Sequence, residues 1–416
     1  MTVSTVAITG LGLVTPAGVG VPASWAAICG GRGTALREQD DTPGPGPQDS
    51  GKRPAYVTCR VPGFDADALL GAQRARRLER FSQFALVAAA EALADAGLDA
   101  EDWDGTRVGV VLGTAFGGVH AYTAAQQTVD RVGAYAVSPL MLPLFLPNMV
   151  AGQAALAFRA TGPCLTVSTA CASGATALGT ARDLLLAGRC DVVVAGGTDA
   201  SLTPAVLAGF GRLGALADPD GGEPAAASRP FDTARDGFVT AEGAGVLILE
   251  RETHARSRGA RVHARLAGYG ATADAHHPVA PHPRGAGLEA AVRGALADAG
   301  LCASAVDHVN AHATGTPRGD AVEADVLQRL FPHRPPVTSV KGVTGHTLGA
   351  AGAIEAVCSV LSVARATLPP TANLAATDPG NGLDIVRRAV RREVATVLTT
   401  SVGFGGQNAA LVVTAP

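Results

Sequence analysis

Short runs of β-branched and aliphatic residues that end in glycine alternate along the chain with longer stretches whose apolar residues recur every three or four positions. The short runs predict buried strands, and five of them occur in the first part of the chain, at 6–12, 108–118, 165–171, 190–199 and 243–250. The longer stretches at 81–97 and 175–188 have helical spacing and end in glycine, as helix C-termini often do. Strands that alternate with helices in this way indicate an α/β fold.

After about residue 258 the same rhythm starts again. A strand is predicted at 263–272 and a helix at 288–300, and further strands are predicted at 307–316, 337–346 and 396–406. We therefore expect two similar halves, residues 1–257 and 258–416, fused into one body without a linker. The low-complexity stretch at 37–54 predicts a surface loop in the first half.

Composition narrows the class of protein. The 416 residues are 47% hydrophobic and 17% charged, which is enough for a large core or two fused ones. The net charge of −3 gives no global attraction to nucleic acid or to an anionic membrane. The most apolar stretch, 137–152, contains three prolines and is shorter than the roughly 20 residues of a spanning helix. The N-terminus resembles no signal peptide, and seven scattered cysteines favour a reducing compartment, so we expect a cytoplasmic protein.

Three residues with nucleophilic or acid–base chemistry stand at predicted strand ends. Cys171 lies where a strand gives way to the small residues of a helix N-terminus, a position that lowers a thiol pKa. His312 and His346 lie in glycine-bearing turns after later strands, where functional residues of α/β proteins tend to gather. Taken alone, Cys171 fits a buried thiol that only packs better than it fits a nucleophile, and we expect its neighbour Cys164 to be such a core residue.

Two other patterns are weaker indications of a functional site. His276, His277 and His282 form a possible metal-binding group, but no acidic or cysteine partner recurs at ligand spacing. The segment GLGLVTPAG at 10–18 resembles a nucleotide-binding loop, yet it lacks the full glycine pattern. We interpret it as a tight turn.

Several motifs in order then make a family resemblance specific. They are STACASG around Cys171, NAHATGT around His312, KGVTGHTLGAAGAIE at 341–355, GFGGQNA at 403–409 and SRPFDTARDGFVTAEGAGVLILE at 228–250. Together they resemble a β-ketoacyl synthase, in particular the elongating condensing enzymes of type II fatty-acid and polyketide systems. The resemblance implies a thiolase-like fold, with two pseudo-duplicated βαβαβαββ halves in five layers, and a dimer.

The resemblance also implies roles for individual residues. Cys171 would accept an acyl chain from a carrier-protein thioester and hold it covalently. The backbone N–H groups of Cys171 and Phe404 would stabilise the oxyanion, and His312 and His346 would donate hydrogen bonds to the enolate that forms when a malonyl thioester loses CO2. Lys341 would add positive charge and pair with Glu355, although this pair could also be purely structural. No metal or organic cofactor is implied.

The substrate and its carrier suggest further residues. The resemblance assigns a substrate-binding role to Phe116, Phe210, Thr314, Thr316 and Gly405. Phe116 stands where such enzymes commonly carry a smaller residue, so we expect a preference for short, or flat unsaturated, acyl chains. Gln407 and Ala241 depart from the usual pattern and favour a polyketide pathway over fatty-acid elongation.

The expected partners are acyl carrier protein, in its acyl and malonyl forms, and a second subunit. Carrier proteins are acidic, so a basic segment is a candidate docking surface, formed by Arg74, Arg76, Arg77 and Arg80, with Arg212 as a weaker candidate. The same arginines could simply be a solvated helix face. The dimer could be a homodimer or a heterodimer with a chain-length subunit.

Three alternatives share parts of the pattern. A thiolase needs a second cysteine near the C-terminus, and residues 359–416 contain none. A non-catalytic chain-length subunit typically lacks the nucleophilic cysteine. A starter synthase of the third type pairs its cysteine with His and Asn rather than with two histidines. The elongating synthase fits best.

Overall fold

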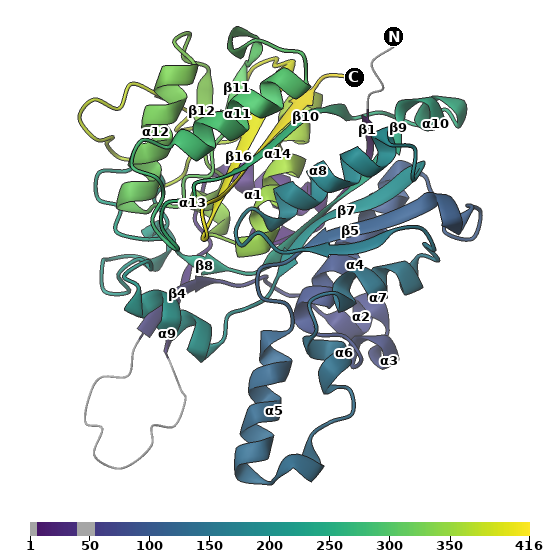
Figure 1. Ribbon diagram of the computed structural model, residues 1–416. Helices are drawn as coiled ribbons and strands as arrows, with labels where there is room; N and C mark the ends of the chain where they lie inside the picture. Colours follow the sequence, from purple (N-terminus) through teal and green to yellow (C-terminus); the bar gives the residue numbers. More distant parts are fainter. Residues whose placement is uncertain (1–5, 40–54) are drawn as a thin grey trace, which may run out of the picture.

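The computed structural model describes residues 6–39 and 55–416, and most of its strands form one twelve-stranded mixed sheet (Figure 1). The first half of the chain contributes five neighbouring strands to this sheet. In spatial order they are β1 (Val6–Thr15), β9 (Gly243–Arg251), β7 (Val192–Asp199), β5 (Val108–Gly113) and β6 (Cys164–Val167). The first two pairings along this order are antiparallel and the next two are parallel.

The second half repeats the same arrangement. Its strands follow in the order β10 (Ala264–Ala273), β17 (Gln407–Thr414), β16 (Thr396–Gly403), β11 (His308–Asn310), β12 (Pro336–Thr338) and β14 (Asp384–Ile385). Again the first two pairings are antiparallel and the next two are parallel. Strands β1 and β10 pair with each other and join the halves.

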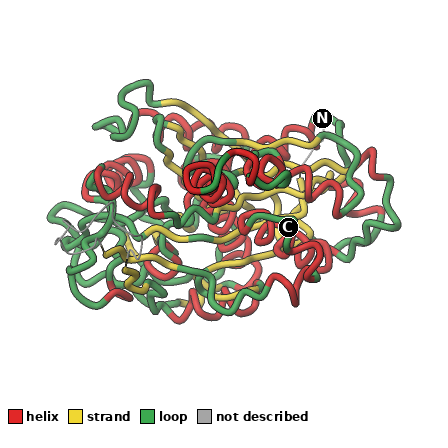
Figure 2. Tube along the Cα trace, turned by 90° about the horizontal axis from the view of Figure 1, so that it is seen from below, coloured by secondary structure: helices red, strands yellow, loops and turns green. Residues whose placement is uncertain are grey.

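Helices separate and cover the two halves of the sheet, which gives five layers (Figure 2). Two helices, α8 (Ser173–Leu186) and α14 (Ala351–Arg365), lie in the middle and contact strands of both halves. Helix α4 (Arg80–Ala96) covers the outer face of the first half, together with α7 (Met149–Ala157). Helix α11 (Ala286–Asp298) covers the second half, together with α12 (Pro317–Leu330). The predicted five-layer α/β fold with two βαβαβαββ halves is confirmed.

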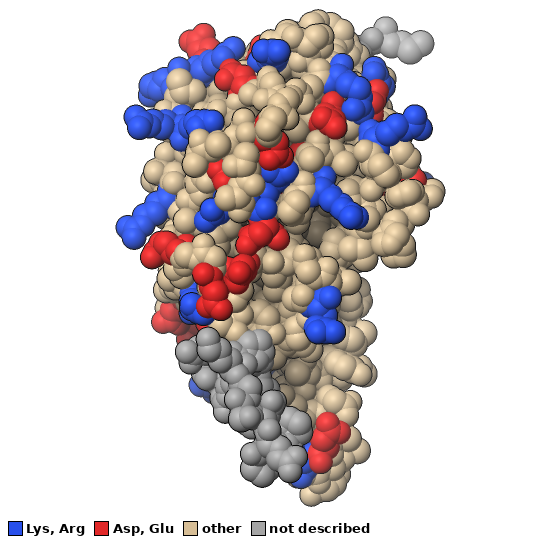
Figure 3. Space-filling model, turned by 90° about the vertical axis from the view of Figure 1, so that its left-hand side faces the viewer, with Lys and Arg blue, Asp and Glu red and all other residues tan. Residues whose placement is uncertain are grey.

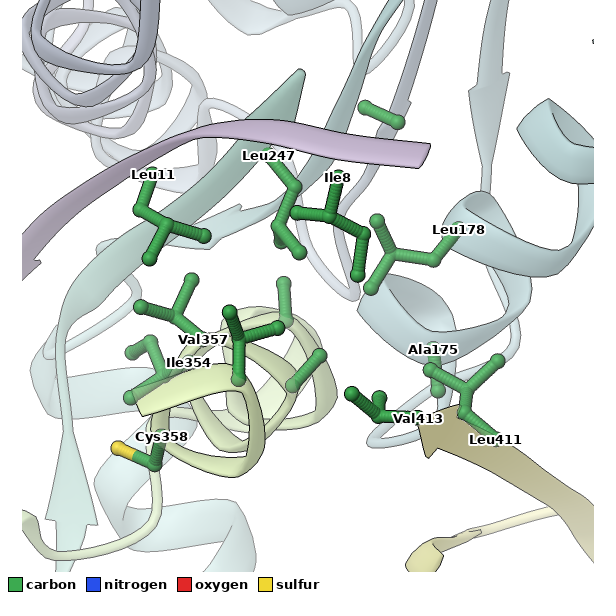
Figure 4. Packing of buried hydrophobic residues seen from close by; sticks show 14 of the residues in the cluster. Ile8, Leu11, Ala175, Leu178, Leu247, Ile354, Val357, Cys358, Leu411 and Val413 are labelled. Carbon is green, nitrogen blue, oxygen red and sulfur yellow. The ribbon is translucent and has the colours of Figure 1, made fainter. Parts of the chain in front are cut away.

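The central layer holds the largest core. Ile8 and Leu247 from the first half and Leu411 from the second pack around Ile354 and Leu178 of the two middle helices (Figure 4). A Cβ on Gly174 of α8 would lie 2.8 Å from the backbone N of Ala353 in α14, so the two helices meet at their N-termini almost backbone to backbone. This close approach brings the loops before both helices to one place.

Shorter elements complete the described chain. The strands are β2 (Gly18–Val19), β3 (Leu36–Gln39), β4 (Ala55–Cys59), β8 (Thr240–Ala241), β13 (Thr367–Leu368) and β15 (Val390–Arg391). The helices are α1 (Val21–Gly30), α2 (Ala66–Leu70), α3 (Ala72–Ala75), α5 (Val119–Arg131), α6 (Met141–Phe145), α9 (Pro204–Arg212), α10 (Glu252–Ser257) and α13 (Lys341–Thr344). Helix α5 projects from the body, and α6 lies between it and α7 (Figure 1). Neither α5 nor α6 contains a buried residue.

Several predicted elements differ from the observed ones in extent. The strands expected at 108–118, 165–171, 307–316 and 337–346 end after a few residues, at 113, 167, 310 and 338. Beyond these points the backbone leaves the sheet to form turns, and residues 341–344 are helical. The tight turn predicted at 10–18 is confined to residues 16 and 17, because residues 10–15 belong to β1 and Gly18 begins β2. Of the loop predicted at 37–54, residues 37–39 belong to β3, and 40–54 lie outside the described residues. The boundary predicted at 257/258 falls between α10 and β10 and stays a prediction.

Two further predictions concern exposure. Cys164 is exposed, so its prediction as a core residue is wrong, because β6 is the edge strand of the sheet. Within the described residues, one stretch, Leu348–Arg365, is long and apolar enough to span a membrane. Because 83% of it is buried inside the protein, it is a core helix.

Candidate active site

Cys171 lies in a tight turn between β6 and α8. Ala170, immediately before it, has φ of 50°, a left-handed conformation that costs energy for a residue with a Cβ. Ser173 fixes the turn, because its Oγ accepts a hydrogen bond from the backbone N–H of Thr169 at 2.9 Å and donates one to the carbonyl of Ala170 at 2.6 Å. The thiol is therefore held at the N-terminus of α8, as the sequence predicts.

The turn opens into a cavity of about 570 Å³. Eight residues predicted for the site line it: Cys171, His312, His346, Phe404, Phe116, Phe210, Thr314 and Thr316. They come from both halves of the chain, which meet here because the two middle helices begin side by side. Lys341, Glu355 and Gly405 do not line the cavity.

A buried carboxylate that the sequence did not single out positions His312. The backbone N–H of His312 donates to Glu323 Oε1 at 2.9 Å, and the backbone N–H of Ala313 donates to Oε2 at 2.7 Å. Thr400 Oγ1 donates to the same carboxylate at 2.6 Å. Glu323 belongs to α12. The sequence could have indicated it only as an acidic residue on the buried face of this helix.

Asp320, on the same helix, holds the residues that follow His312 in place. Its carboxylate accepts hydrogen bonds from the backbone N–H groups of Thr314, Gly315 and Phe231. Burial raises the pKa of Asp320 to about 7. The loop that carries His312, Thr314 and Thr316 is thus held by two buried acids of a single helix.

His346 is held by a short strand of the other half. Its backbone N–H donates to the carbonyl of Val239 at 2.7 Å, and its own carbonyl accepts from Ala241 N–H at 2.9 Å. Gly345, before it, has φ of 66°, and a Cβ there would lie 2.7 Å from the sulfur of Cys59, so no larger residue fits. The imidazole rings of His346 and His312 face each other nearly at right angles, with centroids 5.3 Å apart.

Lys341 lies behind His312, away from the cavity. Its side chain is 2% exposed and forms an ion pair with Glu355, which is 1% exposed. The Nζ atom also lies 3.5 Å from His312 Nδ1. A lysine ammonium can only donate, so Nδ1 is the acceptor, and a neutral His312 then carries its proton on Nε2.

The protonation states follow from burial and from Lys341. Burial, and then the positive charge of Lys341, hold the pKa of both His312 and His346 well below the usual value, so both rings are neutral at physiological pH. Burial raises the pKa of Cys171 to about 12, against the lowering effects of Lys341 and of the backbone N–H groups of Phe404 and Cys171. Burial likewise raises the pKa of Glu355 to about 7, although Lys341 lowers it.

Aromatic rings form one wall of the site. Phe210 contacts Phe116, Phe238 and Phe404 edge to face, at centroid distances of 6.0, 5.2 and 6.1 Å. Phe238 also contacts the ring of His346 at 5.3 Å. Gly405 lies just outside the lining, with φ of 82° and its N–H bonded to the carbonyl of Pro278. The part of the cavity next to Cys171 is therefore apolar and aromatic.

The predicted docking arginines separate into two groups. Arg74, Arg76 and Arg77 are exposed on α3 and the turn after it, and Arg212 is exposed at the end of α9, beside the cavity-lining Leu213. Arg80 instead makes a bidentate ion pair with buried Glu242 and stacks on two phenylalanine rings. Arg80 thus differs from the other four because its guanidinium is already paired, and its docking role stays a prediction. Basic and acidic side chains are interspersed on the face shown in Figure 3.

The three histidines weighed as a metal group lie on a loop whose residues 279–281 line the cavity, but none of the three lines it. The rings of His276 and His282 are 5.1 Å apart. Nδ1 of His277 accepts hydrogen bonds from two backbone N–H groups of its own loop. In the described part of the chain no cluster of three or more His, Cys, Asp or Glu side chains is arranged to hold a metal ion.

Comparison with known proteins gives consistent matches over the whole chain. Residues 3–255 match the N-terminal domain of the beta-ketoacyl synthase family, and residues 263–375 match its C-terminal domain. A 3-oxoacyl-[acyl-carrier-protein] synthase 2 from Vibrio cholerae is 36% identical over 414 residues, which cover 98% of each chain.

Solved structures agree. The ishigamide ketosynthase/chain length factor superposes with a TM-score of 0.89 at 32% identity over 99% of each chain. A type II polyketide synthase ketosynthase, solved with its acyl-carrier protein and bound to the hexaketide, superposes with a TM-score of 0.87 at 31% identity, again over 99% of each chain.

Proposed function

Because the chain belongs to the β-ketoacyl synthase family, we propose that Cys171, His312 and His346 carry out the decarboxylative condensation of an elongating ketosynthase. In this reaction an acyl chain bound to the cysteine is joined to malonyl-acyl carrier protein, which gives 3-oxoacyl-acyl carrier protein and CO2. The observation that supports the assignment is the convergence of one thiol, two neutral imidazoles and two backbone N–H groups on a single cavity.

The first half-reaction loads the acyl chain. The sulfur of Cys171 attacks the carbonyl carbon of the incoming thioester, and the bond to the carrier sulfur breaks. The backbone N–H groups of Cys171 and Phe404, which already interact with the thiol, stabilise the negative oxygen of the tetrahedral intermediate. The proton of the thiol leaves with the carrier thiolate, and the dipole of α8 favours the attacking anion.

The second half-reaction forms the carbon–carbon bond. The malonyl carboxylate leaves as CO2, and its electron pair passes into an enolate whose oxygen accepts hydrogen bonds from His312 and His346. The enolate carbon then attacks the acyl carbonyl, and the Cys171 thiolate is the leaving group. Neutral rings suit this step, because each must donate a hydrogen bond without giving up its proton.

The carrier protein and the pathway belong to the same proposal. A similar ketosynthase is solved with its acyl-carrier protein, and by analogy we place an acidic carrier protein on Arg74, Arg76, Arg77 and Arg212. Gln407 and Ala241, together with the similarity to type II polyketide ketosynthases, favour a polyketide pathway. Seven free cysteines fit a reducing compartment, the cytoplasm.

We place the second subunit against the edge of β6. This strand pairs with β5 on one side, and the described chain has no strand on its other side. Leu165 on the strand is 42% exposed, and Tyr122 on α5 and Leu142 on α6 are about half exposed. The substitution Leu165→Arg should convert a dimer to monomers in light scattering, for a homodimer as well as for a complex with a chain-length subunit.

Intact-mass analysis tests the reaction directly. The protein is mixed with acyl carrier thioesters of two to sixteen carbons, and malonyl carrier is added afterwards. We expect one acyl adduct that is absent in Cys171→Ala and that is discharged as a product two carbons longer. Cys164→Ala is the matched control, because Cys164 is the more exposed thiol seven residues earlier and should not affect loading. An adduct that persists in Cys171→Ala would refute the assignment.

A further inference from the structure

A buried carboxylate that takes no part in these steps lies directly behind the cavity. Asp199 ends strand β7, and its side chain is fully buried. It accepts hydrogen bonds from Thr114 Oγ1 at 2.9 Å, from Ala115 N–H at 2.9 Å and from Phe116 N–H at 3.3 Å. A fourth bond comes from Gly349 N–H at 2.7 Å. One side chain thus ties the loop after β5 to the turn before α14.

The end of β7, the loop after β5 and the turn before α14 pack closely against one another. A Cβ added to Gly349 would lie 2.4 Å from Asp199 Oδ2 and 2.5 Å from the backbone N of Ala115. Leu348, the neighbour of Gly349, has φ of 52°, so its turn is strained and needs support from its surroundings. The carboxylate provides this support through direct bonds.

Both segments that Asp199 holds also form the wall of the cavity. Phe116 from the loop and Leu348 from the turn line it beside Cys171, and Phe116 packs edge to face on Phe210. We propose that Asp199 is a positioning residue that sets the depth of the acyl pocket by fixing Phe116 and Leu348 against each other. This inference rests on the proposed function, since it assumes that the chain on Cys171 occupies this part of the cavity.

The substitution Asp199→Asn changes the hydrogen-bonding atoms of this side chain while keeping its size. A carboxylate offers acceptors to all four donors, whereas an amide has one acceptor oxygen and turns an NH2 group toward backbone N–H groups. The loop should therefore move away, and Phe116 should no longer close the pocket. We expect kcat/KM for loading a ten-carbon chain, relative to a four-carbon chain, to rise about tenfold.

The experiment measures loading of Cys171 by four-carbon and ten-carbon acyl carrier thioesters. Thr114→Val removes the hydroxyl that donates to Asp199 and should change the ratio in the same direction by a smaller factor. Asp191→Asn is the matched control, because Asp191 precedes the same strand and is ion-paired with Arg107 and Arg251. In Asp191→Asn the ratio of ten-carbon to four-carbon loading should equal that of the wild type.

An unchanged ratio in a folded Asp199→Asn protein would refute the inference, and so would a proportional loss of both rates, which indicates damage to the thiol or the fold. If Asp199→Asn fails to fold, Thr114→Val decides, and a wild-type ratio there refutes the inference. Failure of the proposed function looks different, because the wild type would then load no chain on Cys171 at all.

Discussion

Replacing Lys341 with methionine removes a buried ammonium group but keeps the length of the side chain. Glu355 is then left without its partner in a site where both side chains are almost fully buried. Removing one member of a buried ion pair typically costs about 3–5 kcal/mol of stability. Burial already raises the pKa of Glu355 to about 7 with Lys341 beside it, so the carboxylate without its partner would be still harder to ionise.

The loss of stability should depend on pH in a defined direction. Lys341 lowers the pKa of Glu355, so without it this pKa rises above 7. The folded variant then holds a proton that the unfolded chain releases above about pH 4.5. Because Glu355 of the wild type already has a pKa of about 7, the resulting fall in stability of about 1.4 kcal/mol per pH unit should end near pH 7 in the wild type. In the variant it should continue to higher pH, until the raised folded pKa is passed. Urea unfolding at several pH values measures this slope.

The double variant Lys341→Met/Glu355→Leu tests what the lysine does beyond this pair. An apolar pair of similar volume often restores the stability lost by breaking a buried ion pair. His312 would still lack the group that holds its proton on Nε2, so the rate of decarboxylation of malonyl carrier should be about 10- to 100-fold below that of the wild type. This is less than the 100- to 1000-fold typical of removing a donor entirely.

The outcome separates two roles of Lys341. A stable double variant that decarboxylates malonyl carrier at the wild-type rate would show that Lys341 is purely structural, and it would refute the inference about the His312 tautomer. A single variant whose stability follows that of the wild type above pH 7 would contradict the account of Glu355.

Other expected outcomes test separate parts of the site. Because burial raises the pKa of Cys171 to about 12, the loading rate should climb by nearly tenfold per pH unit from pH 6 to 9, and a plateau below pH 8 would contradict this. Decarboxylation by the acylated enzyme should stay flat from pH 6 to 8, since His312 and His346 remain neutral there; a rate that titrates near pH 6.5 would argue against it. Phe116→Ala should raise loading of chains two to four carbons longer than those the wild type accepts by about tenfold in the mass assay. Unchanged loading would show that the ring does not limit the pocket. Arg76→Glu should raise KM for acyl carrier protein about fivefold at low salt and leave a small thioester unaffected; equal effects on both substrates would remove Arg76 from the docking surface.

The local pattern of the chain was sufficient to predict the fold class, and its motifs together were sufficient to predict the principal reacting groups. Strand runs that end in glycine and helical stretches between them are properties of neighbouring residues, so they can be identified without knowing the fold. The same holds for Cys171 at the start of a helix and for the turns that carry His312 and His346, because each motif is a few residues long.

Other features arise only where distant segments meet. Asp199 is 84 residues from Ala115 and 150 from Gly349, and in the sequence it is only an aspartate at the end of a strand. Arg80 could not be separated from Arg76 and Arg77 until Glu242, 162 residues away, was found beside it.

The tertiary structure also decided the states of groups that the sequence had identified. The neutral rings of His312 and His346 and the raised pKa of Cys171 depend on burial and on the charge of Lys341 behind the cavity. Burial is a property of the packed layers rather than of a motif. The sequence alone therefore predicted which groups react, and only the packing of the two halves determined their protonation and the shape of the cavity around them.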